Sequence, residues 1–261
     1  MSESITALEE RAQILRTLHE PGRPLILCNV YDAATAQIIG KNPISKAIAT
    51  ASYGVAAVQG IEDNDMTLEQ NLNGLRMILR VAVEFGKPVT VDLQDGYGDR
   101  LEQAIESIID LGAVGCNIED FNRGTGRLYT LEEATDRVRR TLDTAAKKGV
   151  KSFALNARTD VLKGDGSIQD VIQRGEAFLA AGATTVFVLA GSKRGGLSRG
   201  EIVQLVQALN GRINVLMGIG PGFLTVPELR EIGVARISVG PGLYRKAMET
   251  FSEASNSLLT A

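Results

Sequence analysis

Carboxylates stand at the ends of two neighbouring apolar segments of the sequence. Asp92 and Asp95 straddle the end of a β-branched segment that begins at Val89, and Glu119 follows the mainly apolar segment 113–118. β-Branched residues favour strands, so both segments predict short buried strands. Strands that end side by side in acids would form a pocket of hard oxygen ligands, which suits Mg²⁺ or Mn²⁺ better than zinc or copper. The alternative is that these acids cap the following helices or keep the loops soluble.

A third strand, predicted at residues 152–156, leads into Arg158 and would bring its guanidinium to the same mouth as Asp92 and Glu119. A guanidinium beside a divalent metal is suited to grip a carboxylate or a 2-oxo acid, because the arginine binds one group bidentately while the metal chelates another. A metal in that position acts as a Lewis acid and can stabilise an enolate. Arg158 could instead be a salt-bridge partner of Asp92 or Asp160.

Backbone and acid–base groups come from the connection after the second predicted strand. Ser52, Tyr53 and Gly54 could aim N–H groups at an enolate oxygen or a carboxylate, and Asp63 is near enough along the chain to fold back over the mouth. Ordinary loop polarity explains this segment equally well. The only histidine, His19, ends the N-terminal helical pattern away from every strand end. A histidine base or a Ser-His triad is therefore not expected, and proton transfer falls to carboxylates, Tyr, Lys or water.

Eight short strand patterns alternate with helical patterns along the chain, which is the count expected of a (β/α)₈ TIM barrel, an α/β fold. An N-terminal helix precedes the first strand. The strands are predicted at 25–30, 46–50, from 89, 113–118, 152–156, 184–189, 213–217 and 235–239. The helices are predicted at 4–18, 33–39, 68–85, 101–111, 131–148, 168–181, 201–209, 226–232 and 242–259. Active sites of such barrels lie at the C-terminal ends of the strands, where Asn29, Asp32, Asn117 and Asn214 also fall.

Composition restricts the partners of the chain. A formal net charge of -3 provides no basic face for nucleic acid, so a small soluble ligand is expected. The 261 residues contain no linker, and a single barrel domain over 1–261 fits that length. Residues 1–10 lack the pattern of a secretory signal, and no apolar run approaches a membrane span. Cys28 and Cys116 fall inside predicted strands as buried hydrophobes, so a cytoplasmic protein without disulfides is expected.

Six segments together give the chain a family resemblance. They include an acidic strand end followed by Gly-Tyr-Gly, an Ile-Glu-Asp and an Ala-Arg-Thr-Asp, at residues 29–34, 50–56, 60–63, 91–98, 117–120 and 156–160. Over nearly its full length the chain resembles the isocitrate lyase / phosphoenolpyruvate mutase superfamily, in its carboxyphosphonoenolpyruvate phosphonomutase-like branch. The resemblance implies a barrel whose last helix is exchanged between subunits, in a homodimer or a homotetramer.

The resemblance also implies roles for individual residues. Mg²⁺ would lie near Asp92, with Gln94 and Glu119 in the surrounding shell, and Arg158 would bind a substrate carboxylate. The backbone at Ser52 and Tyr53 would hold the carboxylate or enolate oxygen, and Asp63 would lie close to the reacting group. Gly54, Asn117 and Asn214 are further candidates for substrate contacts.

Two departures from the family pattern restrict the set of reactions expected of this chain. Gln94 stands where an acid is usual, which removes one charge from the metal shell. Residues 121–127 contain none of the Cys, Lys or His of the isocitrate and methylisocitrate lyase loop, so neither lyase is expected. Asn122 and Arg123 are the only stand-ins for the loop residues of phosphonate enzymes. The expectation is a Mg²⁺-dependent C–C lyase, or a related hydrolase or decarboxylase, for a small 2-oxo or 2-hydroxy dicarboxylate. The alternatives are a P–C bond phosphonate enzyme and a barrel that only binds a keto acid.

Overall fold

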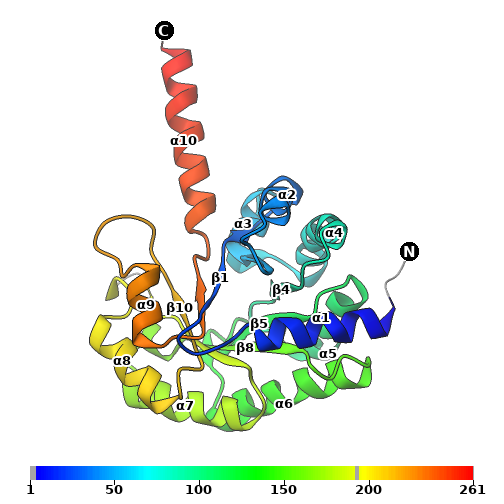
Figure 1. Cartoon of the computed structure of the whole chain (residues 1–261), viewed down its shortest axis with the longest axis vertical. Helices are drawn as coiled ribbons and strands as arrows, with labels where there is room; N and C mark the ends of the chain where they lie inside the picture. Colours follow the sequence, from blue (N-terminus) through cyan, green and yellow to red (C-terminus); the bar gives the residue numbers. More distant parts are fainter. Residues whose placement is uncertain (1–3, 192–193, 261) are drawn as a thin grey trace.

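A parallel sheet that curls round on itself forms the centre of the fold (Figure 1). The computed structural model describes residues 4–191 and 194–260. The nine strands of the sheet follow the order β1-β11-β10-β9-β8-β5-β4-β3-β2. Their bounds are β1 Leu25–Leu27, β2 Asn29–Val30, β3 Ile48–Thr50, β4 Val89–Asp92, β5 Gly115–Glu119, β8 Ala154–Thr159, β9 Thr185–Val188, β10 Ile213–Leu216 and β11 Arg236–Ser238.

The two edges of this sheet are consecutive in the chain. β1 pairs with β11 and β2 pairs with β3, and only Cys28 separates β1 from β2. The single strand predicted at 25–30 is therefore split at the point where it changes partner. Cys28 is half-buried at this break, whereas Cys116 is buried in β5 as expected, and both are free thiols. The split strand joins the two edges, so the predicted (β/α)₈ barrel is confirmed.

Helices follow the strands around the barrel. Their bounds are α1 Ile5–Thr17, α2 Ala33–Lys41, α3 Ser52–Ala57, α4 Leu68–Glu84, α5 Leu101–Asp110, α6 Leu131–Lys147, α7 Ile168–Ala180, α8 Arg199–Ala208, α9 Val226–Ile232 and α10 Gly242–Leu259. Capping boxes at Asp32, Thr67, Thr130, Ser167, Ser198 and Thr225 fix where six of them begin. In each box the side chain of the capping residue accepts a backbone N–H that the helix itself leaves unpaired.

Three elements near the barrel mouth differ from the sequence prediction. β8 ends at Thr159 rather than 156, so Arg158 lies inside the strand. α3 was not predicted, because it is six residues long, contains Gly54 and has no side-chain cap. β6 Phe121–Asn122 and β7 Arg127–Leu128 form an antiparallel hairpin in the expected loop. Short 3₁₀ helices cover Asp63–Asp65 (η1), Gly98–Arg100 (η2) and Val161–Lys163 (η3).

The last helix, α10, stands away from the barrel (Figure 1). None of its residues is buried, and Phe251, Leu258 and Leu259 are strongly exposed. Such a row of exposed apolar side chains is the mark of an interaction surface. Within the described residues no helix is both long and apolar enough to cross a membrane.

The opposite end of the barrel is closed by α1. Leu15 packs on Gly115, where an added Cβ would come within 2.8 Å of the leucine side chain. His19 follows α1 and is buried, with Nδ1 2.8 Å from the Leu15 carbonyl oxygen and Nε2 3.4 Å from Nη1 of Arg236. Arg236 is the first residue of β11. His19 therefore lies away from the C-terminal strand ends, as predicted.

Candidate active site

A cavity of about 1210 Å³ opens at the C-terminal ends of the strands. It brings together most of the residues that the sequence singled out for chemistry. Ser52, Tyr53, Asp63, Asp92, Asn117, Arg158 and Asn214 line it, whereas Gly54, Gln94 and Glu119 do not. Asn214 is buried in the wall, where its Nδ2 donates to Ser238 Oγ over 3.2 Å.

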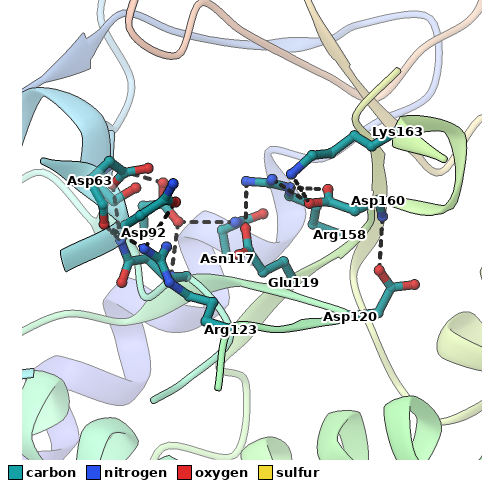
Figure 2. Close-up of polar contacts among 12 residues, drawn as sticks. Asp63, Asp92, Asn117, Glu119, Asp120, Arg123, Arg158, Asp160 and Lys163 are labelled. Atoms are coloured by element: carbon teal, nitrogen blue, oxygen red, sulfur yellow. Dashed lines mark hydrogen bonds and ion pairs between the residues drawn. The ribbon is translucent and has the colours of Figure 1, made fainter. Parts of the chain in front are cut away.

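Four side chains from adjacent strands form a chain of hydrogen bonds that ends on Asp92. Strand register places Asp92, Asn117, Asn156 and Thr185 level with one another on β4, β5, β8 and β9. The Thr185 hydroxyl donates to Asn156 Oδ1 over 2.7 Å, and Asn156 Nδ2 donates to Asn117 Oδ1 over 2.9 Å. Asn117 Nδ2 then donates to Asp92 Oδ1 over 3.1 Å (Figure 2). We refer to these four residues as the amide relay.

Asn117 uses both ends of its amide within this relay. Its Nδ2 is directed at Asp92 and its Oδ1 accepts from Asn156, although the side chain lines the cavity. Its geometry is that of a residue that holds the carboxylate in place. Asn156 and Thr185 were not selected from the sequence. Asn156 and Arg158 are two positions apart, so in a strand their side chains lie on the same face. This spacing is the sequence signal that could have identified Asn156.

The Asp92 carboxylate is surrounded by N–H donors. Besides Asn117, the Gln94 N–H donates to Oδ1 over 3.3 Å and the Ser52 N–H donates to Oδ2 over 3.1 Å. The Ser52 N–H, expected to face substrate, is thus directed at Asp92. The next N–H in α3, that of Tyr53, has no acceptor within the described residues. A carboxylate has about four lone-pair sites, so one site remains on Oδ2 of Asp92.

The connection carrying Asp63 folds over the mouth, as the sequence suggested. Gln94 Nε2 donates to the Asp63 carbonyl oxygen over 2.7 Å and to its Oδ1 over 3.0 Å. Arg123, on the hairpin loop, donates to the same carbonyl oxygen over 2.6 Å (Figure 2). An acid at position 94 would place a second carboxylate against Asp63, and that like-charge contact explains why an amide suits this position.

Arg158 is held by two carboxylates at the edge of the cavity (Figure 2). Its Nε and Nη2 donate to Asp160 over 2.6 and 2.7 Å, and Nη1 lies 2.7 Å from Glu119 Oε2. The salt bridge to Asp160 that the sequence left open is therefore present. A guanidinium has five N–H donors, so one remains on each terminal nitrogen. Arg158 is restrained in one orientation and can still bind an anion.

The two acids around Arg158 differ in protonation. Burial raises the pKa of Glu119 to about 7, because Arg158 offsets only part of the desolvation. For Asp160 burial acts in the same direction, but Arg158 and Lys163 outweigh it and the pKa is lowered. Lys163 Nζ lies 2.9 Å from Asp160 Oδ2. Asp160 is therefore the main counter-charge of Arg158, and Glu119 holds a proton more readily than an ordinary glutamate does.

Asp120 supports this arrangement from behind the strand. Its Oδ1 accepts the Asp160 N–H over 2.8 Å, and its Oδ2 accepts from Arg174 Nη1 over 3.0 Å. Asp95, which stands beside Asp92 at the end of the predicted strand, does not line the cavity. Its carboxylate accepts the N–H groups of Tyr97 and Arg123 over 3.0 and 3.4 Å.

The donor set fits a water-rich magnesium ion better than one enclosed by several carboxylates. Within residues 4–191 and 194–260 no cluster of three His, Cys, Asp or Glu side chains could hold a metal. Asp92 retains a free acceptor site at the cavity, with the Asp63 carboxylate on the same lining. Mg²⁺ commonly keeps several waters and binds one or two carboxylates, so Asp92 together with water could hold it. Glu119 is engaged by Arg158, and Gln94 directs its Nε2 at Asp63; ligation by either stays a prediction.

Comparisons with known proteins identify the family of the chain. The family model described as phosphoenolpyruvate phosphomutase matches residues 15–259. An oxaloacetate decarboxylase of Rhodopseudomonas palustris (strain BisB5) is 25% identical over 239 residues, which cover 88% of this chain and 78% of that protein.

Two solved structures extend the likeness to three dimensions. A protein from Burkholderia cenocepacia J2315, provisionally named a phosphonomutase, is 35% identical with a TM-score of 0.84, over 96% of this chain and 99% of that chain. A 2,3-dimethylmalate lyase, described as a PEP mutase/isocitrate lyase superfamily member, is 25% identical with a TM-score of 0.81, over 95% and 87%. The chain therefore belongs to the phosphoenolpyruvate phosphomutase family and is an enzyme of the PEP mutase/isocitrate lyase superfamily.

Proposed function

We propose that the chain is a Mg²⁺-dependent lyase that cleaves a C–C bond, or a related hydrolase or decarboxylase, in a small 2-oxo or 2-hydroxy dicarboxylate. The observation that carries the proposal is the pairing of an anchored cation with an anchored carboxylate. Arg158 and Asp92 line one cavity, and the neighbours of each leave donors or an acceptor site unused. Relatives that are named oxaloacetate decarboxylase and 2,3-dimethylmalate lyase support a diacid substrate.

In this proposal Arg158 binds a substrate carboxylate through its two unused N–H donors. Asp160 and Glu119 hold the guanidinium in place, so little side-chain freedom is lost on binding. The Tyr53 N–H is available for the carboxylate or the enolate oxygen. Mg²⁺, or Mn²⁺, when held by Asp92 and water, would supply Lewis-acid stabilisation of the charge that develops on the 2-oxo group. Gln94 and Arg123 hold Asp63 over the mouth, where its carboxylate is positioned to transfer a proton to or from the substrate.

We also propose that the chain forms a homo-oligomer, a dimer or a tetramer, through α10. The helix has no buried residue, and its apolar side chains have no cover in the isolated chain. Its first turns line the cavity through Gly242, Arg245 and Glu249. The docking of α10 on another subunit would therefore also fix one wall of the site.

Isothermal titration with oxalate, an enolate mimic, tests the lyase proposal. Binding should require Mg²⁺ and should be lost in Arg158→Ala, because the variant removes the cation at the carboxylate position. Arg139→Ala, an exposed arginine on α6, is the matched control and should bind as the wild type does. Absence of oxalate binding to the wild type with and without Mg²⁺ would contradict the proposal. A barrel that has no such chemistry would then be the better interpretation.

A phosphonate enzyme is the second candidate function. The provisional phosphonomutase from Burkholderia cenocepacia J2315 shares 35% of its residues with this chain, and this observation favours the alternative. Assay of phosphonopyruvate beside a set of C–C substrates decides between the two. Turnover of phosphonopyruvate alone would replace the lyase proposal, and turnover of a C–C substrate alone would remove the alternative.

A further inference from the structure

Two of the walls of the active-site cavity, apart from the one formed by α10, differ in their chemistry. The groups proposed to hold the acid lie on the side formed by β3, β4, β5 and β8. On the opposite side, formed by the ends of β9 and β10 and the loops that follow, the lining includes the polar residues Ser198 and Arg199 and six large apolar side chains. These are Phe187, Leu189, Leu216, Met217, Phe223 and Leu224. We call these six residues the apolar wall.

The apolar wall is continuous with the proposed anion site. The guanidinium carbon of Arg158 lies 5.8 Å from the centre of the Phe187 ring, and Phe187 is 9% exposed. A carboxylate bound to Arg158 would therefore have an apolar surface directly beside it. Phe223 also lines the cavity, and its ring lies on the backbone of Gly218, so that an added Cβ there would come within 2.4 Å of the ring.

The size of the cavity exceeds what a small diacid fills. The volume of about 1210 Å³ is larger than the roughly 300–1,000 Å³ of pockets that hold drug-sized ligands. A diacid of four or five carbons bound between Arg158 and Asp92 would leave the apolar wall in contact with water. Exposed apolar surface of this kind becomes favourable only when a ligand or another protein surface covers it.

We propose that the substrate carries an apolar substituent of several carbons on the carbon next to the carbonyl group, and that the apolar wall binds it. This inference rests on the proposed function, because it places the acid head of the same substrate on Arg158. The residues of the wall would then determine which 2-oxo or 2-hydroxy acid the enzyme accepts. Cover of the wall by another copy of the chain is the competing possibility.

N-Alkyl oxamates test this assignment, because their amide nitrogen replaces the carbon that would bear the substituent. Affinity is measured by isothermal titration with Mg²⁺ for oxamate and its N-methyl to N-butyl derivatives. Each added methylene should tighten binding about fourfold, the factor for burial of one CH₂ group. If oxamate binds and needs Arg158 but affinity stays constant or falls with alkyl chain length, the binding role proposed for the apolar wall would be overturned. The proposed function would remain intact. Absence of all oxamate binding would overturn both.

Two variants locate the effect. Met217→Gln keeps the side-chain length but makes the wall polar. It should therefore reduce the gain in affinity per added methylene and leave the affinity for oxamate itself within about twofold of the wild-type value. Met77→Gln makes the same change at a residue on α4 that is 52% exposed and outside the cavity, and it should alter neither quantity. Phe223→Ser, at a 49% exposed position, provides a second test in case Met217→Gln folds poorly. Unchanged chain-length dependence in both wall variants would refute the assignment.

Discussion

Acidification should destabilise the fold through His19. Burial, with the charge of Arg236 as the second cause, lowers the pKa of this histidine from 6.5 to about 3. The imidazole is neutral, with Nδ1–H directed at the Leu15 carbonyl oxygen and Nε2 facing Nη1 of Arg236. Protonation would place a second cation against the Arg236 guanidinium in a buried site. The folded state therefore resists a proton that the unfolded chain accepts.

The sign and the size of the effect follow from linkage. Between pH 6.5 and about pH 3 the unfolded state binds more protons at His19 than the folded state does, so stability falls as the pH falls. From pH 7 to pH 5 the loss amounts to about 2 kcal/mol, and well below pH 3 it approaches about 5 kcal/mol, at 1.36 kcal/mol for each unit of pKa difference. A loss of this size is a large fraction of the stability of a typical domain.

Urea unfolding followed by circular dichroism at pH 7 and pH 5 measures the loss, at one protein concentration because an oligomer depends on mass action. Carboxylates titrate in the same range, so the comparison is with His19→Gln, which should lack about 2 kcal/mol of the pH-dependent loss. Because the chain has a single histidine, its imidazole resonance reports the pKa directly. Equal losses in both proteins, or an imidazole in the folded state that titrates near 6.5, would refute the reasoning.

Three further outcomes are expected. Thr185→Val should lower stability by roughly 1–3 kcal/mol, because the buried Asn156 Oδ1 loses its donor. Asp160→Asn should lower it by roughly 3–5 kcal/mol, because Arg158 would keep its charge in a buried site without its bidentate partner. Both losses are measured by urea unfolding. Phe251→Glu should shift the oligomer toward smaller species in light scattering, because it puts a charge on the exposed apolar face of α10.

Each of these variants has a matched control. Thr185→Ser retains the hydroxyl and should keep most of the stability. Asp110→Asn breaks an exposed pair with Lys148 and should cost about 0–1 kcal/mol. Ser252→Glu adds the same charge at the neighbouring position of α10 and should leave the oligomer intact. If a control lost as much stability as its partner variant, or shifted the oligomer as far, the structural reason given for that variant would not hold.

The barrel was predictable because its signals are local. Apolar β-branched runs end in polar residues, and capping residues such as Thr67 and Thr130 mark the helix starts within a few positions. The placement of Asp92 and Arg158 at the same mouth of the barrel followed from the alternation of strands and helices, because parallel strands all have their C-terminal ends on one side.

The partners of the site residues could not be predicted, because they depend on register and on side-chain rotamers. The sequence left open whether a salt bridge of Arg158 would be to Asp92 or to Asp160, and the structure shows that Asp160 and Glu119 hold it. Gln94 adopts a φ of 54°, in the left-handed region. Nothing in its local sequence indicates that its amide turns toward a residue thirty-one positions earlier in the chain.

The amide relay has a consequence for how this sequence can diverge. Each asparagine in it both gives and receives a hydrogen bond, so the direction of every link depends on the one before it. Replacement of Asn156 by an acid would place a carboxylate oxygen against the Oδ1 acceptor of Asn117, unless the neighbouring residues changed as well. The four positions should therefore substitute as a set among relatives that retain the site, although they lie on four strands spread over almost a hundred residues of chain.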